Sequence, residues 1–212
     1  MKRINVWISR ILLSITALCY LWVLIQVLFF DDIHGKDTGT LVVWMFAGLA
    51  VMGGFFILFR RAENWIKRWY HFLVPAFLVI YGIALIRIGF LLRFTPSFDM
   101  DAIYSGAIQW LQEGSFRDFY EYYGYFPNNL GAMGFLYLVF SVTSWFGITD
   151  FFAVGIVVNS FLILGTIYTI SWICRRLAGE MAGLLSLAAV LLCLPFLFMG
   201  AAFYTDSLSL LF

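Results

Sequence analysis

The sequence predicts an all-α, polytopic integral membrane protein, on three observations. Hydrophobic residues fill 63% of the 212 positions, and charged residues only 12%, whereas a soluble domain has about 25% charged residues. The third observation is a series of apolar runs, each near the length of a membrane span. A soluble globule of this size has too little interior to bury so much apolar surface, which excludes ordinary soluble enzymes and disulfide-stapled secreted domains. The net charge of +1 provides no basic excess for nucleic acid.

Five of the apolar runs are long enough to cross a bilayer core, which takes about 20 helical residues. The first follows a basic start and resembles a signal peptide, but its length and the lack of a small-residue cleavage site favour a retained helix. A sixth run, Leu130–Phe146, is shorter, and a seventh begins at Ser207. The five predicted spans are Ile11–Phe30, Leu41–Phe59, His71–Leu92, Phe151–Cys174 and Met181–Gly200.

The distribution of charge predicts the orientation, because loops rich in Lys and Arg stay in the cytoplasm. Basic residues cluster at the N-terminus, at 60–68 and at Arg175-Arg176, whereas the loop over 31–37 is rich in acids. Three apolar runs separate the second cluster from the third, but an even number of crossings is required. We therefore expect Leu130–Phe146 to lie on the external side without crossing. Most of the 13 basic residues then lie inside, and all but two of the 12 acidic residues lie outside.

The external segment of about 93–150 is the only long stretch outside the predicted spans, and it holds the candidate chemistry. Asp99 and Asp101 follow the outer end of the third span. Apolar residues at helical spacing then predict a short amphipathic helix on the membrane surface, with Gly114 as its stop. These apolar residues are Ile103, Ala107, Trp110 and Leu111.

The two acids have more than one interpretation. An Asp at a helix start commonly caps it by accepting backbone N–H bonds, and for Asp101 alone capping is favoured. A pair beside Arg87 and Arg93 indicates more, because a carboxylate can act as general base on a hydroxyl and two can share a divalent cation. Either arginine could bind a lipid phosphate, or Arg87 could extend its guanidinium to the interface.

Seven aromatic residues lie within eleven positions after this helix. One interpretation is an interfacial aromatic belt, and the other is a groove in which some rings contact a lipid chain or a sugar. The two interpretations can hold for different rings. The seven are Phe116, Phe119, Tyr120, Tyr122, Tyr123, Tyr125 and Phe126.

Taken in order, these residues resemble the N-terminal part of membrane glycosyltransferases of the GT-C type, in particular family 39, the protein O-mannosyltransferase and aminoarabinose-transferase group. The resemblance covers about 71–212, so residues 1–70 are expected to be a two-helix transmembrane extension and the chain the N-terminal part of a longer protein. The residues that carry it are Asp99, Asp101, Tyr104, Ala107, Gly114, Tyr125-Phe126-Pro127-Asn128-Asn129-Leu130-Gly131, Phe146-Gly147, Arg175-Arg176-Leu177-Ala178-Gly179 and Tyr204-Thr205-Asp206-Ser207.

The resemblance implies a polyprenyl-phosphate-linked sugar as donor and an external hydroxyl of a glycan, lipid or protein as acceptor. It assigns the catalytic base to Asp99 with Asp101 as the second acid, and leaves open which of the two is the base. Relatives have Lys and Glu where this chain has Asn128 and Asn129. A divalent cation is the one cofactor under consideration. The residues expected to contact substrate are Arg93, Tyr104, Tyr125, Asn128, Asn129 and Asp206.

Two other classes of function remain open. A transporter or flippase subunit for lipid-linked sugars would keep charged or broken segments near the bilayer midplane. The main polar or breaking residues within the predicted spans are Gln26, Asn159 and Pro195, and no acid lies deep in one. A non-catalytic membrane scaffold is the third possibility. We expect a multi-pass cell-membrane protein with a cytoplasmic N-terminus and an external active site.

Overall fold

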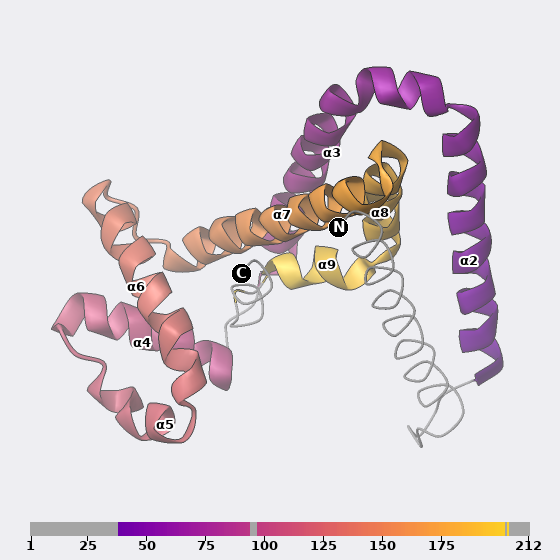
Figure 1. Ribbon diagram of the computed structural model, residues 1–212. Coiled ribbons are helices and arrows are strands. Elements are labelled where there is room, and N and C mark those ends of the chain that lie inside the picture. Colours follow the sequence, from indigo (N-terminus) through magenta and orange to yellow (C-terminus); the bar gives the residue numbers. More distant parts are fainter. Residues whose placement is uncertain (1–37, 94–96, 202, 204–212) are drawn as a thin grey trace, which may run out of the picture. The chain divides into compact units, whose positions relative to one another are not determined.

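The computed structural model describes residues 38–93, 97–201 and 203 (Figure 1). Every regular element within these ranges is a helix, which confirms the all-α prediction for them. The predicted span Ile11–Phe30 and the candidate residue Asp206 lie outside the described residues. The contacts divide the chain into two units, Met1–Gly54 and Phe55–Phe212.

Helix α2, Thr38–Arg61, begins in the first unit and ends in the second. It contains the predicted run Leu41–Phe59 and carries Arg60 and Arg61 in its last turn. The two arginines stabilise this end of the helix, because cations there interact favourably with the negative end of the helix dipole.

Helix α3, Glu63–Leu91, begins well before the predicted start at His71. Only Ala62 separates it from α2, so Lys67 and Arg68 are helical and not part of a loop. The Lys67 ammonium lies 2.7 Å from the Glu63 carboxylate one turn earlier, a spacing that stabilises a helix. An apolar run identifies only the apolar part of a helix, so the charged first turns of α3 were not predicted.

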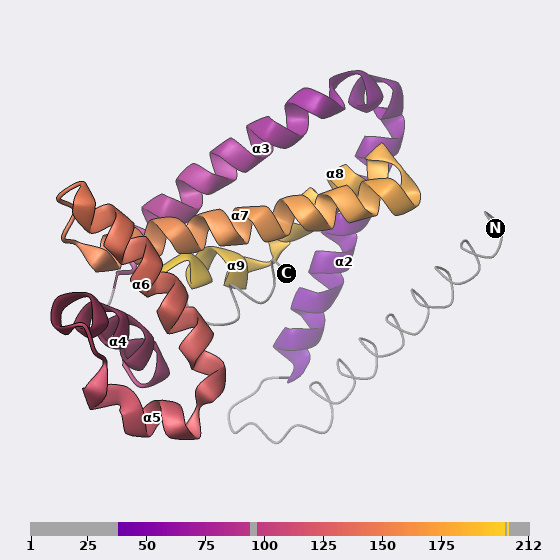
Figure 2. The same cartoon turned by 60° about the vertical axis from the view of Figure 1, so that its left-hand side comes forward.

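Helix α7, Phe151–Ala178, runs back along α3 (Figure 2). Among the described residues, α3 and α7 are the two helices long and apolar enough to cross a membrane. The Asp150 side chain accepts a hydrogen bond from the Ala153 N–H at 3.1 Å and so caps the start of α7. Gly179, with φ of 91° and ψ of 178°, separates α7 from the next helix in a conformation essentially restricted to glycine.

The predicted span Met181–Gly200 is interrupted near Pro195 and does not form one helix. The chain forms α8, Glu180–Leu192, and then two short helices, α9, Leu194–Phe198, and η4, Met199–Ala201. Pro195 accounts for the break, because it has no N–H to donate to a preceding turn but is well tolerated in the first turn of a new helix. The Asn159 amide of α7 donates to the Met199 carbonyl at 2.6 Å and holds the broken segment in place.

The segment between α3 and α7 forms a small helical layer. Helix α4, Asp99–Glu113, packs against α6, Leu130–Trp145, and three short helices connect them: η2, Arg117–Phe119, α5, Tyr120–Tyr125, and η3, Pro127–Asn129. The predicted amphipathic helix is confirmed as α4: Ile103 and Ala107 are fully buried, and Gly114 ends it with φ of 71°. Their partners on α6 are Met133, Leu136 and Phe140.

Helix α6 has 16 residues, about 24 Å at 1.5 Å per residue. This is shorter than a hydrocarbon core of about 30 Å. The length agrees with the expectation that Leu130–Phe146 does not cross, which remains a prediction.

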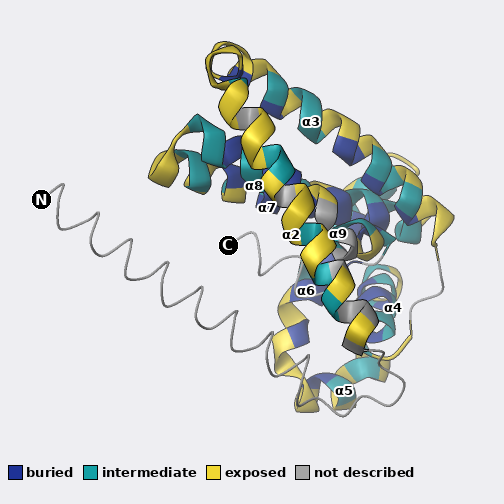
Figure 3. Cartoon of the chain, turned by 90° about the vertical axis from the view of Figure 1, so that its right-hand side faces the viewer, coloured by how far each residue is buried: buried dark blue, intermediate teal, exposed yellow. Residues whose placement is uncertain are grey.

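A second apolar core joins α3, α7 and α8 through Tyr70, Leu85, Ile167 and Leu187. The other faces of these helices carry exposed apolar side chains, and Figure 3 shows the exposed positions along α3. Contiguous apolar surface of this kind is rare on soluble monomers. Exposed examples on α3 are Phe72, Val79, Ile80 and Ile83.

Candidate functional site

The two candidate acids lie in the first turn of α4, just after the end of α3. Asp99 is the first residue of the helix, and both side chains are partly exposed. The preceding residue, Phe98, has φ of 53° and ψ of −129° and is the only non-glycine residue with positive φ in the described part of the chain. A bulky residue in such a conformation is strained, and strain of this kind gathers at functional sites. The Phe98 side chain is 92% exposed.

Asp101 does not cap the helix, contrary to the interpretation favoured for it alone. The N-cap position is Phe98, and Asp101 is the third helical residue. Its carboxylate accepts a hydrogen bond from the Ser105 hydroxyl one turn later, at 2.5 Å. Both acids still lie at the positive end of the α4 dipole, which favours negative charge.

Tyr104 is a core residue and not an accessible ligand. Its ring is 2% exposed and stacks on Phe152 of α7 at 5.2 Å between centroids. Its hydroxyl accepts a hydrogen bond from the Phe203 backbone N–H at 3.3 Å. Burial raises the pKa of the Tyr104 phenol to about 12, so it stays neutral and able to donate near pH 7. Tyr104 therefore joins α4 to α7 and to the chain after η4.

Arg93 is engaged by another side chain. Its guanidinium donates two hydrogen bonds to the Asp150 carboxylate, at 2.8 and 2.7 Å. These hydrogen bonds hold the pKa of Asp150 below its ordinary value. The pair is partly exposed, so a phosphate would have to compete with Asp150 for this arginine.

The predicted residues around η3 separate into two kinds. Asn129 is 1% exposed, donates to the Tyr122 hydroxyl at 2.5 Å and accepts from Asn128 at 3.0 Å. It therefore fixes the start of α6. Asn128 is exposed and Tyr125 is 74% exposed, so both are accessible to a ligand.

The aromatic run also separates into packing and exposed residues. Tyr123 is buried and donates to the Ala102 carbonyl at 2.9 Å. Phe116, Phe119 and Tyr122 pack against the same core. The choice between belt and groove therefore concerns only the exposed rings of Tyr120, Tyr125 and Phe126.

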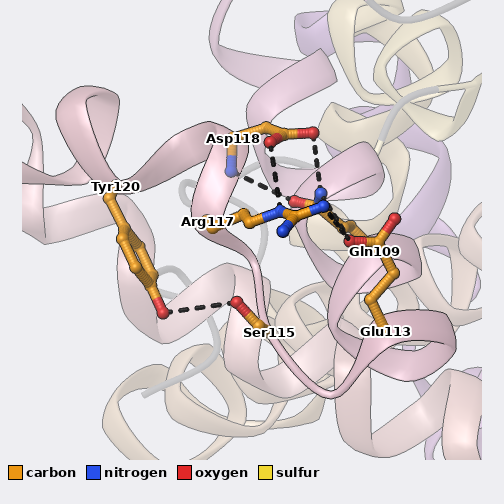
Figure 4. Close-up of polar contacts among 6 residues, drawn as sticks. All are labelled: Gln109, Glu113, Ser115, Arg117, Asp118 and Tyr120. Atoms are coloured by element: carbon orange, nitrogen blue, oxygen red, sulfur yellow. Dashed lines mark hydrogen bonds and ion pairs between the residues drawn. The ribbon is translucent and has the colours of Figure 1, made fainter.

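Sequence reasoning missed a polar network at the other end of α4 (Figure 4). Gln109 is 9% exposed, and its amide donates to Asp118 at 2.7 Å and to Glu113 at 3.1 Å. Arg117 lies 3.8 Å from each of these carboxylates. The signal was a glutamine on the apolar face of an amphipathic helix, and the network fixes the turn from α4 to η2.

The predicted site residues are thus only partly brought together. Asp99 and Asp101 share the first turn of α4, whereas Tyr104 is buried in the core, Arg93 is bound to Asp150 and Asn129 lies in the α5–α6 connection. Within residues 38–93, 97–201 and 203, no group of three or more His, Cys, Asp or Glu side chains is placed to hold a metal ion.

Comparison with known proteins identifies no relative. No protein-family model matches the chain, and no curated protein or solved structure matches it at a significant level.

Proposed function

We propose that this protein is a membrane glycosyltransferase similar to GT-C enzymes of family 39, and that it transfers a sugar from a polyprenyl-phosphate donor to an external hydroxyl. The observation that carries the proposal is the Asp99–Asp101 pair in the first turn of α4, which begins after the strained residue Phe98 and follows in sequence a helix long enough to span a membrane. A donor whose lipid tail lies in the bilayer presents its phosphate and sugar at the membrane surface, where such a helix would end.

The multi-pass placement in the membrane is part of the proposal. Two observations support it: α3 and α7 are long enough to cross, and their outer faces are apolar and exposed. The basic residues at the α2–α3 and α7–α8 turns support a cytoplasmic location for those turns. The α4–α6 layer then lies on the external side, with the acids.

The proposed reaction is a single displacement. Asp99 accepts the proton of the acceptor hydroxyl while that oxygen attacks the anomeric carbon, and the bond from this carbon to the phosphate oxygen breaks. One displacement inverts the anomeric centre, by the logic of inverting glycosidases. The Asp101 carboxylate, held by Ser105, supplies the second negative group, either to orient the acceptor or to share a divalent cation with Asp99.

The leaving phosphate needs a cation, because negative charge develops on it as the bond breaks. Arg93 is tied to Asp150, which favours Arg87 for this role. Arg87 is exposed in the last part of α3. A guanidinium suits phosphate because its fork of N–H groups matches the oxygens.

Asp206 is proposed as a third acid of the site. Phe203, three positions before it, is fully buried in the α4–α6–α7 core and bonded to Tyr104. This role rests on the resemblance, because Asp206 lies outside the described residues.

A flippase for lipid-linked sugars is the alternative, and the break at Cys193 favours it. Interrupted apolar segments are typical of transporters, and the break here is held by the buried Asn159. The two functions differ in their products. A flippase moves the donor intact between leaflets, whereas a transferase releases polyprenyl phosphate.

The experiment that tests the proposal uses the full-length protein in liposomes that contain a radiolabelled polyprenyl-phosphate sugar. We expect release of polyprenyl phosphate that depends on an added hydroxyl acceptor and matches the sugar gained by the acceptor. Movement of intact donor between leaflets without release would favour the flippase instead.

A further inference from the structure

An apolar cleft lies between the end of α2, α3 and α8. Its volume is about 560 Å³, within the range of small-molecule pockets. Its lining is apolar throughout and includes Leu58, Trp65, Ala76, Ile80, Leu184 and Leu191. On α3 it extends from Trp65 to Ile80, about 22 Å along the helix. It is therefore long enough for an alkyl chain of one leaflet, whose depth is about 15 Å.

One end of this cleft is strongly basic. Leu58 and Ala62 line it, and Arg60 and Arg61 lie between them in the last turn of α2. Lys67 and Arg68 follow in the first turns of α3, and Lys67 is paired with Glu63 at 2.7 Å. Four cations and one acid give residues 60–68 a net charge of about +3. This basic segment therefore lies next to one end of the apolar cleft.

Two tryptophans mark the level of this basic end. Trp65 is 55% exposed and lines the cleft, and Trp69 is 43% exposed one turn later. Exposed tryptophans gather at membrane interfaces, where the ring meets the headgroups. Clusters of basic residues just cytoplasmic of a membrane helix attract anionic lipids. The cations therefore lie where a phospholipid headgroup would lie, the tryptophans at the level of the membrane interface, and the apolar cleft where an acyl chain would lie.

From this order we infer that the cleft binds one anionic phospholipid of the cytoplasmic leaflet, with its phosphate at Arg60 and Arg61 and an acyl chain between α3 and α8. The inference rests on the membrane placement in the proposed function and not on sugar transfer. It assigns this site a bound lipid that is neither donor nor acceptor.

The test is native mass spectrometry of the full-length protein in detergent, titrated with dioleoyl phosphatidylglycerol or dioleoyl phosphatidylcholine. We expect phosphatidylglycerol to remain bound at lower concentration than phosphatidylcholine. The Ala76→Phe substitution fills the cleft and should abolish most of this binding. Ala189→Phe is the matched control, because Ala189 is exposed on α8 and does not line the cleft.

The charge is tested separately by Arg60→Gln combined with Arg61→Gln. Both side chains are exposed, so the fold should be retained and the affinity for phosphatidylglycerol should fall by about fivefold per arginine. Affinity for phosphatidylcholine should not change. Arg176→Gln, at the other basic turn, is the control and should leave both affinities unchanged.

Several results would overturn the inference. They are equal retention of the two lipids, phosphatidylglycerol binding that survives Ala76→Phe, and binding insensitive to the loss of Arg60 and Arg61. If the apolar run Ile11–Phe30 or a second copy of the chain fills the cleft, the unaltered protein will bind no more phosphatidylglycerol than Ala76→Phe does. Each of these readouts is independent of the transfer assay.

Discussion

The Arg93 guanidinium and the Asp150 carboxylate form a two-pronged ion pair, with hydrogen bonds of 2.8 and 2.7 Å, across 57 positions of sequence. The same carboxylate accepts the Ala153 N–H at the start of α7. Asp150 therefore links the two ends of the segment that forms the α4–α6 layer and also caps α7. This arrangement fixes where the chain leaves α3 and where it returns to α7.

Removing Asp150 should cost more stability than removing Arg93. Asp150→Ala loses the cap and the ion pair, which together contribute about 1–2 kcal/mol, whereas Arg93→Gln loses only a partly exposed pair of under about 1 kcal/mol. Thermal unfolding of the purified protein in detergent measures the difference. Equal losses for the two variants would show that Asp150 does not cap α7.

The same pair predicts a pH dependence. The pKa of Asp150 is held below its ordinary value of 3.8. The carboxylate therefore contributes fully to the free energy of unfolding above about pH 4, and this contribution is lost as the pH falls further and the carboxylate becomes protonated. The gap in melting temperature between the unaltered protein and Asp150→Asn should therefore narrow below pH 4. A gap that stays constant down to pH 3 would contradict the assignment.

Gly155 provides a test of the contact between α4 and α7. A Cβ added there would overlap the Tyr104 phenol ring, so Gly155→Ala should destabilise the protein by about 1–3 kcal/mol. Gly134 in α6 has open space around it, and Gly134→Ala should be neutral or stabilising by up to about 1 kcal/mol. Both are measured by thermal unfolding, and a stabilising Gly155→Ala would mean that Tyr104 does not pack there.

The aromatic run should respond unevenly to loss of its hydroxyls. Tyr123→Phe removes a buried hydrogen bond to the Ala102 carbonyl and should cost about 1 kcal/mol of stability. Tyr125 is 74% exposed, so Tyr125→Phe should leave stability unchanged. If Tyr125→Phe were the more destabilising of the two in thermal unfolding, the division into packing and exposed rings would be wrong.

The topology can be tested by cysteine labelling in a cysteine-free background. Asn128 and Thr149 are exposed at the two ends of α6, and cysteines at both should react with an impermeant reagent added outside intact cells. Leu177, exposed near the basic turn after α7, should react only in permeabilised cells. Labelling at Thr149 only after permeabilisation would mean that α6 crosses the membrane.

Much of the helical layout could be predicted from periodicity and punctuation in the sequence. The α4 helix followed from apolar spacing that ends at Gly114, and Leu130–Phe146 corresponds closely to α6. Pro195 was recognised as a breaking residue within the run Met181–Gly200, but hydropathy did not place the end of α8 at Leu192. The early start of α3 at Glu63 was missed because its first turns are charged and therefore lie outside the apolar run.

The candidate site was harder to predict, because residue type indicates chemistry and not direction. Tyr104 and Asn129 were assigned to substrate, but their side chains lie in the core. Arg93 was assigned to phosphate, and nothing in the local sequence announces a partner 57 positions away at Asp150. The acids of α4 keep their proposed role, since both are partly exposed on one turn.

The most direct test of the proposed chemistry is sugar transfer from a polyprenyl-phosphate donor by full-length protein carrying Asp99→Asn, with Asp101→Asn for comparison and Glu121→Gln as an exposed control. Loss of a general base should lower the rate by about 10²–10⁴-fold in Asp99→Asn, with membrane insertion and thermal stability unchanged, while Glu121→Gln keeps full activity. Transfer at the unaltered rate by Asp99→Asn would contradict the assignment of Asp99 as the base, and transfer at the unaltered rate by both variants would contradict the role of the acid pair.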